Sequence, residues 1–392
     1  MDFRKNNLDL YMLNNQKHLF NLSEDSIYLN GAYMSPQLRA VTDIGIENLN
    51  KKSQPHVITA NDFFSEKIVL RQRFARLIDS PDPETIAIIP SVSYGIATAM
   101  HNIPFDEGDE IVVLEEQFPS NYYSWKQLET EQRVVIKTIY APPLEKGRGQ
   151  TWNTRILETI SSKTKCVALP IIHWADGTKF DLVAIRKRTD EVGAYLIIDG
   201  TQSIGAMPFS VAQIKPDALI CAGYKWLLGP YSLGLAFFGE RFHNGTPIEN
   251  NWMNHKDSEN FANLVNYNIE FKPKAVRYDV GESSNFILTP MLSEALKQLL
   301  TWTPEAVQQY CKTLCEEPIK KLQEAGYFIE EPNDRAHHLF GIYLPEEKNI
   351  EELKKLLAGK NIFVSYRGQA IRVAPNVYND VNDLEKLLSC FL

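Results

Sequence analysis

Short apolar runs alternate with helical patterns between about residues 80 and 240, and no other feature of the chain constrains its fold as strongly. The runs are rich in valine and isoleucine without an alternating polar partner, which is typical of strands buried on both faces. Strands are expected at 85–89, 110–114, 133–140, 165–172, 194–198, 217–221 and 233–238. Helical patterns at 93–101, 154–161, 181–191 and after Asn121 lie between them. This alternation predicts a mostly parallel α/β sheet with helices on both faces.

The pattern changes after about residue 265. A long helical stretch covers 289–322, with a break expected near Pro304, and short strands and a helix follow. The stretch 141–152 holds two prolines and two glycines and is predicted to be a loop. A chain of 392 residues is long enough for a large domain and a smaller one. We therefore predict an N-terminal segment packed on the small domain (1–20), a large domain (21–265) and a small α+β C-terminal domain (266–392).

Charge and cysteine content exclude several classes of function. The net charge of −8 does not suit nucleic-acid binding, which needs a basic surface. Five cysteines are too few and too scattered for a disulfide framework, and Cys311 and Cys315 have no second pair with which to hold a metal. The first residues lack the apolar core of a secretory signal, and the most apolar stretch, 216–239, is interrupted by Lys225 and Pro230. We expect a cytoplasmic protein that binds no metal, nucleic acid or membrane.

Polar residues that follow the strands are the natural candidates for chemistry, because ligands of an open α/β sheet bind beyond the carboxyl ends of its strands. Asp199 directly follows the expected strand 194–198; it could hold a cationic ring nitrogen or simply cap a helix. Lys225 follows the strand 217–221 among glycine, tyrosine, tryptophan and leucine. Burial lowers the pKa of a lysine, and Schiff-base chemistry needs the neutral amine. A lysine that extends to the surface is the alternative.

In order and spacing, Asp199, Gln202 and Lys225, with the Gly-Pro-x-x-x-Gly run at 229–234, resemble the class V aminotransferase family. These fold type I enzymes use pyridoxal 5′-phosphate (PLP) and include cysteine desulfurases, kynureninases and isopenicillin N epimerase. The resemblance extends from about Ile27 to Tyr378. It implies the PLP-dependent transferase fold, with a large PLP-binding domain and a smaller C-terminal one.

The resemblance implies a role for each matching residue around the cofactor. Lys225 would form the internal aldimine and move protons, Asp199 would hold the pyridinium nitrogen, and Gln202 would contact the ring hydroxyl. A second group would surround the phosphate and the ring face. Its members are Ser91, Val92 and Ser93 at a strand-to-helix turn, Tyr224 at the phosphate, and Phe118 stacked on the ring, although Phe118 could also be plain core.

On the substrate side, Arg372 matches the family's carboxylate-binding arginine. Asn30 and Tyr33 match a segment that lines the substrate entrance, and His173 is a further candidate that would more often be structural. Gly281 lies in the segment RYDVGESSN, which in the family reaches the neighbouring subunit's phosphate. The resemblance therefore implies a homodimer with shared active sites.

The reaction type is less constrained than the cofactor. Desulfurases carry a cysteine on a loop just upstream of the carboxylate arginine, but here no cysteine lies between Cys315 and Cys390, and only four residues separate Arg367 from Arg372. We predict an aminotransferase or C–S (β-)lyase that acts on a small L-amino acid through an external aldimine and an α-carbanion. A kynureninase-like hydrolase and an epimerase are alternatives. From other classes we weigh a non-catalytic PLP-binding protein, and a nucleotide-binding protein, which would need a glycine-rich turn that 90–95 lacks.

Overall fold

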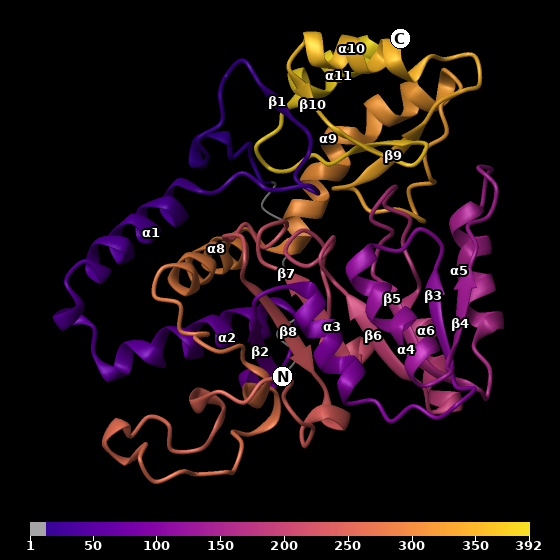
Figure 1. Cartoon of the computed structure of the whole chain (residues 1–392). Helices are drawn as coiled ribbons and strands as arrows, with labels where there is room; N and C mark the ends of the chain where they lie inside the picture. The colour runs from indigo at the N-terminus through magenta and orange to yellow at the C-terminus, as the bar shows by residue number, and fades with distance from the viewer. Residues whose placement is uncertain (1–12) are drawn as a thin grey trace, which may run out of the picture.

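A seven-stranded sheet forms the centre of the larger part of the computed structural model, which describes residues 13–392 (Figure 1). Its strands are β2 (Ile86–Ile89), β3 (Glu110–Leu114), β4 (Val135–Ile139), β5 (Thr164–Pro170), β6 (Tyr195–Asp199), β7 (Ala218–Ala222) and β8 (Gly234–Phe238). They lie in the order β2-β8-β7-β6-β5-β3-β4, and only β8 is antiparallel to its neighbours. The predicted α/β fold with a mostly parallel sheet is confirmed.

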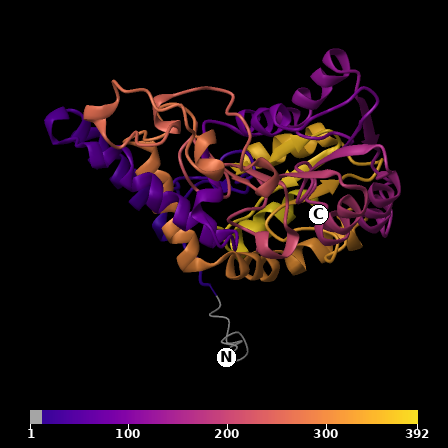
Figure 2. The same cartoon turned by 90° about the horizontal axis from the view of Figure 1, so that it is seen from below.

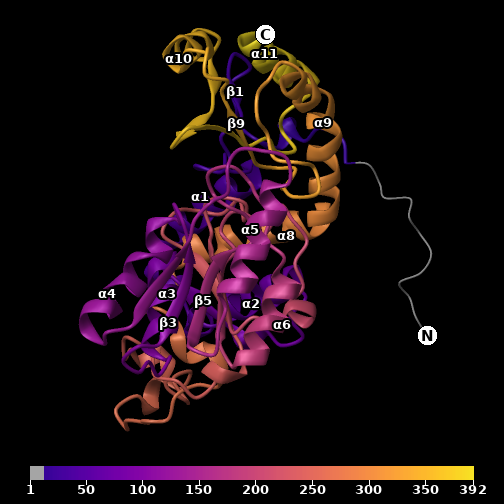
Figure 3. The same cartoon turned by 90° about the vertical axis from the view of Figure 1, so that its right-hand side faces the viewer.

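Helices cover both faces of this sheet, as Figure 3 shows. The helices of this larger part are α1 (Arg39–Lys52), α2 (Ser65–Leu77), α3 (Val92–His101), α4 (Tyr123–Glu131), α5 (Arg148–Thr159), α6 (Leu182–Val192), α7 (Val211–Ile214) and α8 (Leu288–Trp302). Apolar side chains of α3 and α4 form a core with one face of the strands. Side chains of α2, α5, α6 and α8 form a second core on the other face. Because both faces are covered, the strand residues are apolar without alternation.

The smaller part combines the two ends of the described chain (Figure 1, top). It contains β1 (Ile27–Tyr28), β9 (Phe340–Tyr343), β10 (Ile362–Phe363), β11 (Ser365–Arg367), β12 (Ala370–Val373), α9 (Pro304–Glu324), α10 (Ile350–Gly359) and α11 (Val381–Phe391). β1 pairs in parallel with β10, and β11-β12-β9 form an antiparallel sheet. The expected helix break lies at Thr303, between α8 and α9. α8 packs on α1 and α2 of the larger part.

The domain boundaries at residues 20 and 265 stay predictions, and residues 1–12 of the expected N-terminal segment lie outside the described residues. One local prediction was wrong: the stretch 141–152 is not all loop, because α5 begins at Arg148. Arg148 is buried, and its guanidinium pairs with Asp176 at 3.1 Å and with Glu330 at 3.4 Å. These partners are distant in the sequence, so the local composition could not indicate the helix start. None of the helices in the described part of the chain is long and apolar enough to cross a membrane.

A buried ion cluster attaches α2 to β2. The carboxylate of Asp279 pairs with the amine of Lys67 at 3.2 Å and with the guanidinium of Arg71, and it accepts the backbone N–H of Ile88 at 2.9 Å. All three charged side chains are buried. An uncompensated buried charge costs far more than an exposed one.

We expect Asp279→Asn to lower the free energy of unfolding of the apoprotein by about 3–5 kcal/mol, because two buried cations lose their anion. Urea unfolding measures this loss. Asp190→Asn is the matched control: Asp190 on α6 is exposed, its partner Arg186 keeps a second carboxylate, Asp217 at 2.8 Å, and an ion pair with an exposed member contributes about 0–1 kcal/mol. Equal losses in the two variants would contradict the expectation.

Candidate functional site

The carboxyl ends of five strands meet at one cavity of about 320 Å³. β2, β3, β5, β6 and β7 all run in the same direction, so the segments that follow them lie at one edge of the sheet. Each of these segments contributes to the cavity wall. The volume is within the usual range for sites that bind small molecules.

Lys225 follows β7 and reaches into this cavity. It is 5% exposed, and its Nζ lies 5.0 Å from the centre of the Phe118 ring and 5.5 Å from that of Tyr224. Burial lowers the pKa of Lys225 to about 8, against the opposing effect of Asp199. A larger fraction of this amine is therefore neutral, and nucleophilic, near neutral pH than for an exposed lysine.

The lowered pKa of Lys225 predicts how the rate of cofactor uptake depends on pH. We expect the rate at which the apoprotein takes up PLP to rise with pH and to level off above about pH 8, because only the neutral amine of Lys225 attacks an aldehyde. Stopped-flow absorbance between pH 6 and pH 11 would measure this rate; free lysine with PLP is the control. A rate that keeps rising up to the ordinary lysine pKa would contradict the expectation.

Asp199 ends β6 and is buried at the cavity wall. Its Oδ1 accepts the backbone N–H of Thr201 at 3.0 Å. Among residues 13–392, no cationic side chain lies within ion-pair distance of this carboxylate, and burial raises its pKa. A buried carboxylate that faces a cavity and has no direct ion-pair partner fits the protonated ring nitrogen of PLP.

The N-terminus of α3 forms another part of the wall. Ser91 caps the helix, its Oγ accepting the backbone N–H of Tyr94 at 3.2 Å, and the hydroxyls of Ser91 and Ser93 lie 2.9 Å apart. Ser91, Val92 and Ser93 all line the cavity. Backbone N–H groups at a helix N-terminus favour an anion, so this end of the cavity fits the cofactor's phosphate.

Aromatic rings and an amide complete the wall. The rings of Phe118 and Trp174 meet edge to face with centres 5.4 Å apart. Gln202 donates from Nε2 to the Ala32 carbonyl at 3.0 Å and accepts the indole N–H of Trp226 at 2.9 Å, which fixes its amide. Tyr224 also lines the cavity. Trp174 is a wall residue that the sequence did not single out.

Arg372 on β12 lies behind Trp174. Its side chain is 1% exposed; it donates to the Trp174 carbonyl at 2.9 Å and to the Ser365 hydroxyl at 3.4 Å, while Nε has no partner. Burial lowers the pKa of Arg372 to about 9, and the positive charge of Arg367 adds to this effect. A buried arginine without a carboxylate partner is suited to an anionic substrate group.

Besides Arg372, four predicted site residues lie outside the cavity wall. His173 is buried against Trp152, with ring centres 5.1 Å apart, and its Nδ1 lies 3.5 Å from Asp176. Gly281 donates its backbone N–H to Glu249. Asn30 accepts from the Ser365 hydroxyl at 2.6 Å, and Tyr33 is 56% exposed. His173 thus has the surroundings of a structural histidine, whereas Asn30 lies beside the serine that contacts Arg372.

Comparisons with solved structures concern the fold of the chain. A complex of the cystine C–S lyase C-DES with cysteine persulfide superposes with a TM-score of 0.80 at 16% identity, over 93% of this chain and 97% of that one. A cysteine desulfurase from Thermococcus onnurineus NA1 gives a TM-score of 0.80 at 18% identity, over 95% of both chains. At these identities the likeness shows the fold.

Sequence comparisons identify the family. An uncharacterized aminotransferase of Bacillus subtilis, YcbU, is 25% identical over 315 residues, 80% of each chain. A probable cysteine desulfurase of Methanothermobacter thermautotrophicus is 28% identical over 223 residues, 55% of this chain and 54% of that one. The family model "Aminotransferase class-V" matches residues 38–386. The family uses PLP, for which the cavity has a lysine, a buried carboxylate and a helix N-terminus. The chain belongs to the class V aminotransferase family of PLP-dependent enzymes.

Proposed function

We propose that this enzyme is an aminotransferase or a C–S (β-)lyase that acts on a small L-amino acid. The observation that carries the proposal is the position of Lys225, a buried amine of lowered pKa in one cavity with Asp199, with Arg372 behind the cavity wall. PLP, when bound, supplies an electron sink that stabilises negative charge at the α-carbon of the substrate.

Each wall of the cavity supports one part of this chemistry. Asp199 would keep the ring nitrogen protonated, and the N-terminus of α3 would hold the phosphate. Phe118 and Trp174 would exclude water from the reacting atoms. Arg372 would orient the substrate through its α-carboxylate, which leaves the Lys225 Nζ to take up and return the proton of the α-carbon.

The hairpin of β11 and β12 argues against a desulfurase mechanism. Its turn contains Gly368 and Gln369 and no cysteine. All five cysteines are buried and free. No thiol of the chain is therefore placed to receive sulfur from a substrate held at Arg372. Their free state also supports our proposal of a cytoplasmic, reducing location.

We further propose a homodimer with shared active sites. Gly281 lies outside the cavity of its own chain. Exposed apolar side chains gather on α1 and in the segment 252–269, and these two regions lie at the same side of the molecule in Figures 1 and 2. The most exposed are Ile46, Leu49, Val265, Tyr267 and Ile269. Apolar surface of this extent favours a protein partner, and a second copy would bring Gly281 toward the neighbouring cavity.

The visible spectrum of the purified protein tests the proposed function. We expect a yellow band from bound PLP that changes when single L-amino acids are added. Conversion to the pyridoxamine form would indicate an aminotransferase; release of pyruvate or sulfide without that form would indicate a lyase. Alanine release from kynurenine, or racemisation of the amino acid, would support the hydrolase or the epimerase instead. A colourless protein that takes up no PLP would refute the proposal.

A further inference from the structure

A second arginine lies on the same face of the hairpin as Arg372. β11 and β12 pair with Ser365 opposite Arg372 and Arg367 opposite Ala370. Side chains two apart on a strand point to the same face, so Arg367, Ser365 and Arg372 share that face. Diagonal neighbours of this kind have Cα atoms roughly 7–8 Å apart, within reach of long side chains.

Both guanidinium groups approach the same aromatic ring. The Cζ atom of Arg367 lies 5.4 Å from the centre of the Trp174 ring, and that of Arg372 lies 5.9 Å from it. Trp174 forms part of the cavity wall. The positive charges of both arginines also lower the pKa of Lys225, in agreement with their position near the cavity. The two cations therefore lie together beside Trp174, at one side of the cavity.

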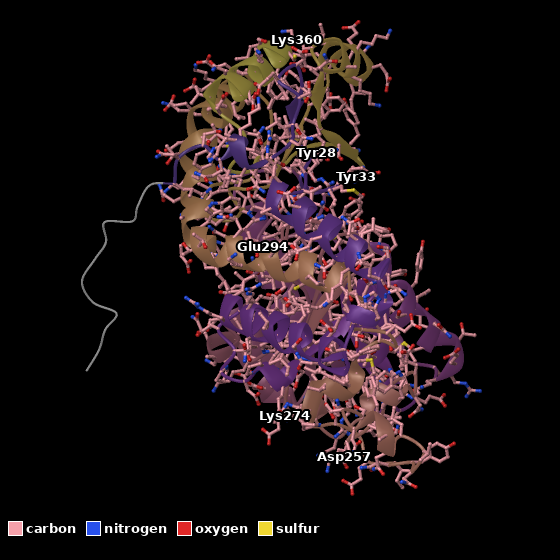
Figure 4. The ribbon with its side chains drawn as sticks, turned by 90° about the vertical axis from the view of Figure 1, so that its left-hand side faces the viewer. Tyr28, Tyr33, Asp257, Lys274, Glu294 and Lys360 are labelled. Carbon is pink, nitrogen blue, oxygen red and sulfur yellow. The ribbon has the colours of Figure 1, made fainter. Side chains whose placement is uncertain are left out.

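Neither arginine has an internal anion. Within residues 13–392, no carboxylate lies within 4 Å of either guanidinium. Arg367 donates to the Tyr366 carbonyl at 2.7 Å. Burial lowers its pKa, and the hydroxyl of Tyr33 acts in the opposite direction. Figure 4 shows Tyr33 near Tyr28, beside the junction of the two parts of the molecule.

Glu116 carries an acidic side chain close to this hairpin, yet no ion pair joins it to either arginine within residues 13–392. Its carboxylate lies beside the hairpin turn, where a Cβ added to Gly368 would be 3.4 Å from Oε1. Its backbone carbonyl accepts the indole N–H of Trp174 at 2.6 Å, which fixes the segment. Two like charges on one sheet face repel each other, and an anion bound between them from outside the chain would relieve this repulsion.

We propose that the substrate carries a second negative charge on its side chain: Arg372 binds the α-carboxylate and Arg367 binds the side-chain anion. The proposal rests on the proposed function and narrows it to acidic amino acids, such as the dicarboxylic ones. The planar fork of a guanidinium suits the carboxylate group on each side. Trp174, whose ring both guanidinium groups approach, would keep both cations in place by cation–π contact.

The proposal is tested by comparing each acidic amino acid with its neutral amide, which has nearly the same shape. The PLP-loaded enzyme is titrated with L-aspartate and L-asparagine, and with L-glutamate and L-glutamine, while the cofactor spectrum reports the Kd of each. In at least one pair we expect the acid to bind about 10- to 100-fold more tightly than its amide, the value of one charged hydrogen bond. Arg367→Gln should reduce this ratio toward one, and Arg367→Lys should restore part of it. A merely structural role of Arg367 would weaken both members of a pair equally and leave their ratio unchanged.

A second measurement does not depend on any reaction. Calorimetry of the same PLP-loaded protein measures the affinity for succinate, which carries two carboxylates, and for its monoamide succinamate, which carries one. Tighter succinate binding that is lost in Arg367→Gln would support the proposal. Equal affinities for succinate and succinamate, or a wild-type enzyme that binds the amides more tightly than the acids, would overturn the proposed role of Arg367 while leaving the PLP chemistry intact. A protein that takes up no PLP would instead remove the proposed function, and the inference with it.

Discussion

Lys225→Ala removes the yellow band of the bound cofactor and lowers turnover of any accepted amino acid by at least about 10²- to 10⁴-fold, the contribution of a positioned acid–base group. The reason is that no second amine replaces it: Lys225 is the lysine that lines the cavity in the described part of the chain. Its loss removes both the covalent attachment of the cofactor and the group that would move the α-proton. Absorbance and single-turnover kinetics measure the two losses separately.

The control for this variant is Lys126→Ala, because Lys126 lies on the exposed surface of α4 and pairs only with Glu129. It should keep both the band and the turnover. Borohydride would reduce the bond between the cofactor and its lysine in the wild-type protein. Peptide mapping would then identify that lysine. A label on any lysine other than Lys225 would contradict the assignment.

Asp199→Asn is expected to lower kcat by about 10²- to 10³-fold, the usual cost of removing one preorganised electrostatic contact. Asparagine keeps the size of the side chain and the oxygen that accepts from Thr201, so the change is one of charge. Without the negative charge the ring nitrogen loses its proton more readily, and the ring withdraws fewer electrons from the substrate. Steady-state kinetics and the Kd for PLP would show the effect.

Thermal unfolding of the apoprotein separates this loss from damage to the fold. Burial raises the pKa of Asp199, so its ionised form costs stability at pH values above the pKa of the unfolded chain. Asp199→Asn removes that cost, and the Tm of the apoprotein at neutral pH should stay level or rise. A fall in Tm together with kcat would mean that Asp199 supports the structure and not the chemistry. Asp199→Glu, which keeps the charge, should retain more activity than Asp199→Asn.

The position of Asp199 and Lys225 at one cavity could be predicted from the sequence because strand ends define it. Asp199 and Lys225 directly follow buried apolar runs, and the parallel order of those runs brings their ends together. The position of Ser91 could be predicted for the same reason, because Ser91 lies between a strand and the start of α3. The fold class could be predicted from the alternation of apolar runs and helical patterns along the chain.

Residues whose role depends on distant partners could not be predicted in this way. His173 and Trp174 are adjacent, and only the packed structure shows that His173 faces Trp152 and Asp176 while Trp174 faces the cavity. Arg367 gains its position from the register of the hairpin, which places it on the same face as Arg372. Local composition contains neither the register nor the buried partners of Arg148.

The pairing of β1 with β10 has a consequence for biosynthesis. Asn30, just after β1, accepts a hydrogen bond from Ser365, just after β10, across 335 positions of the chain. At ribosomal rates of 5–20 residues per second, roughly 20–70 s pass between the synthesis of the two strands. During that interval β1 has no strand partner, whereas the larger sheet can already form. The hairpin that carries Arg372 is therefore completed last, and nascent chains interrupted before β10 would hold the sheet and Lys225 without it.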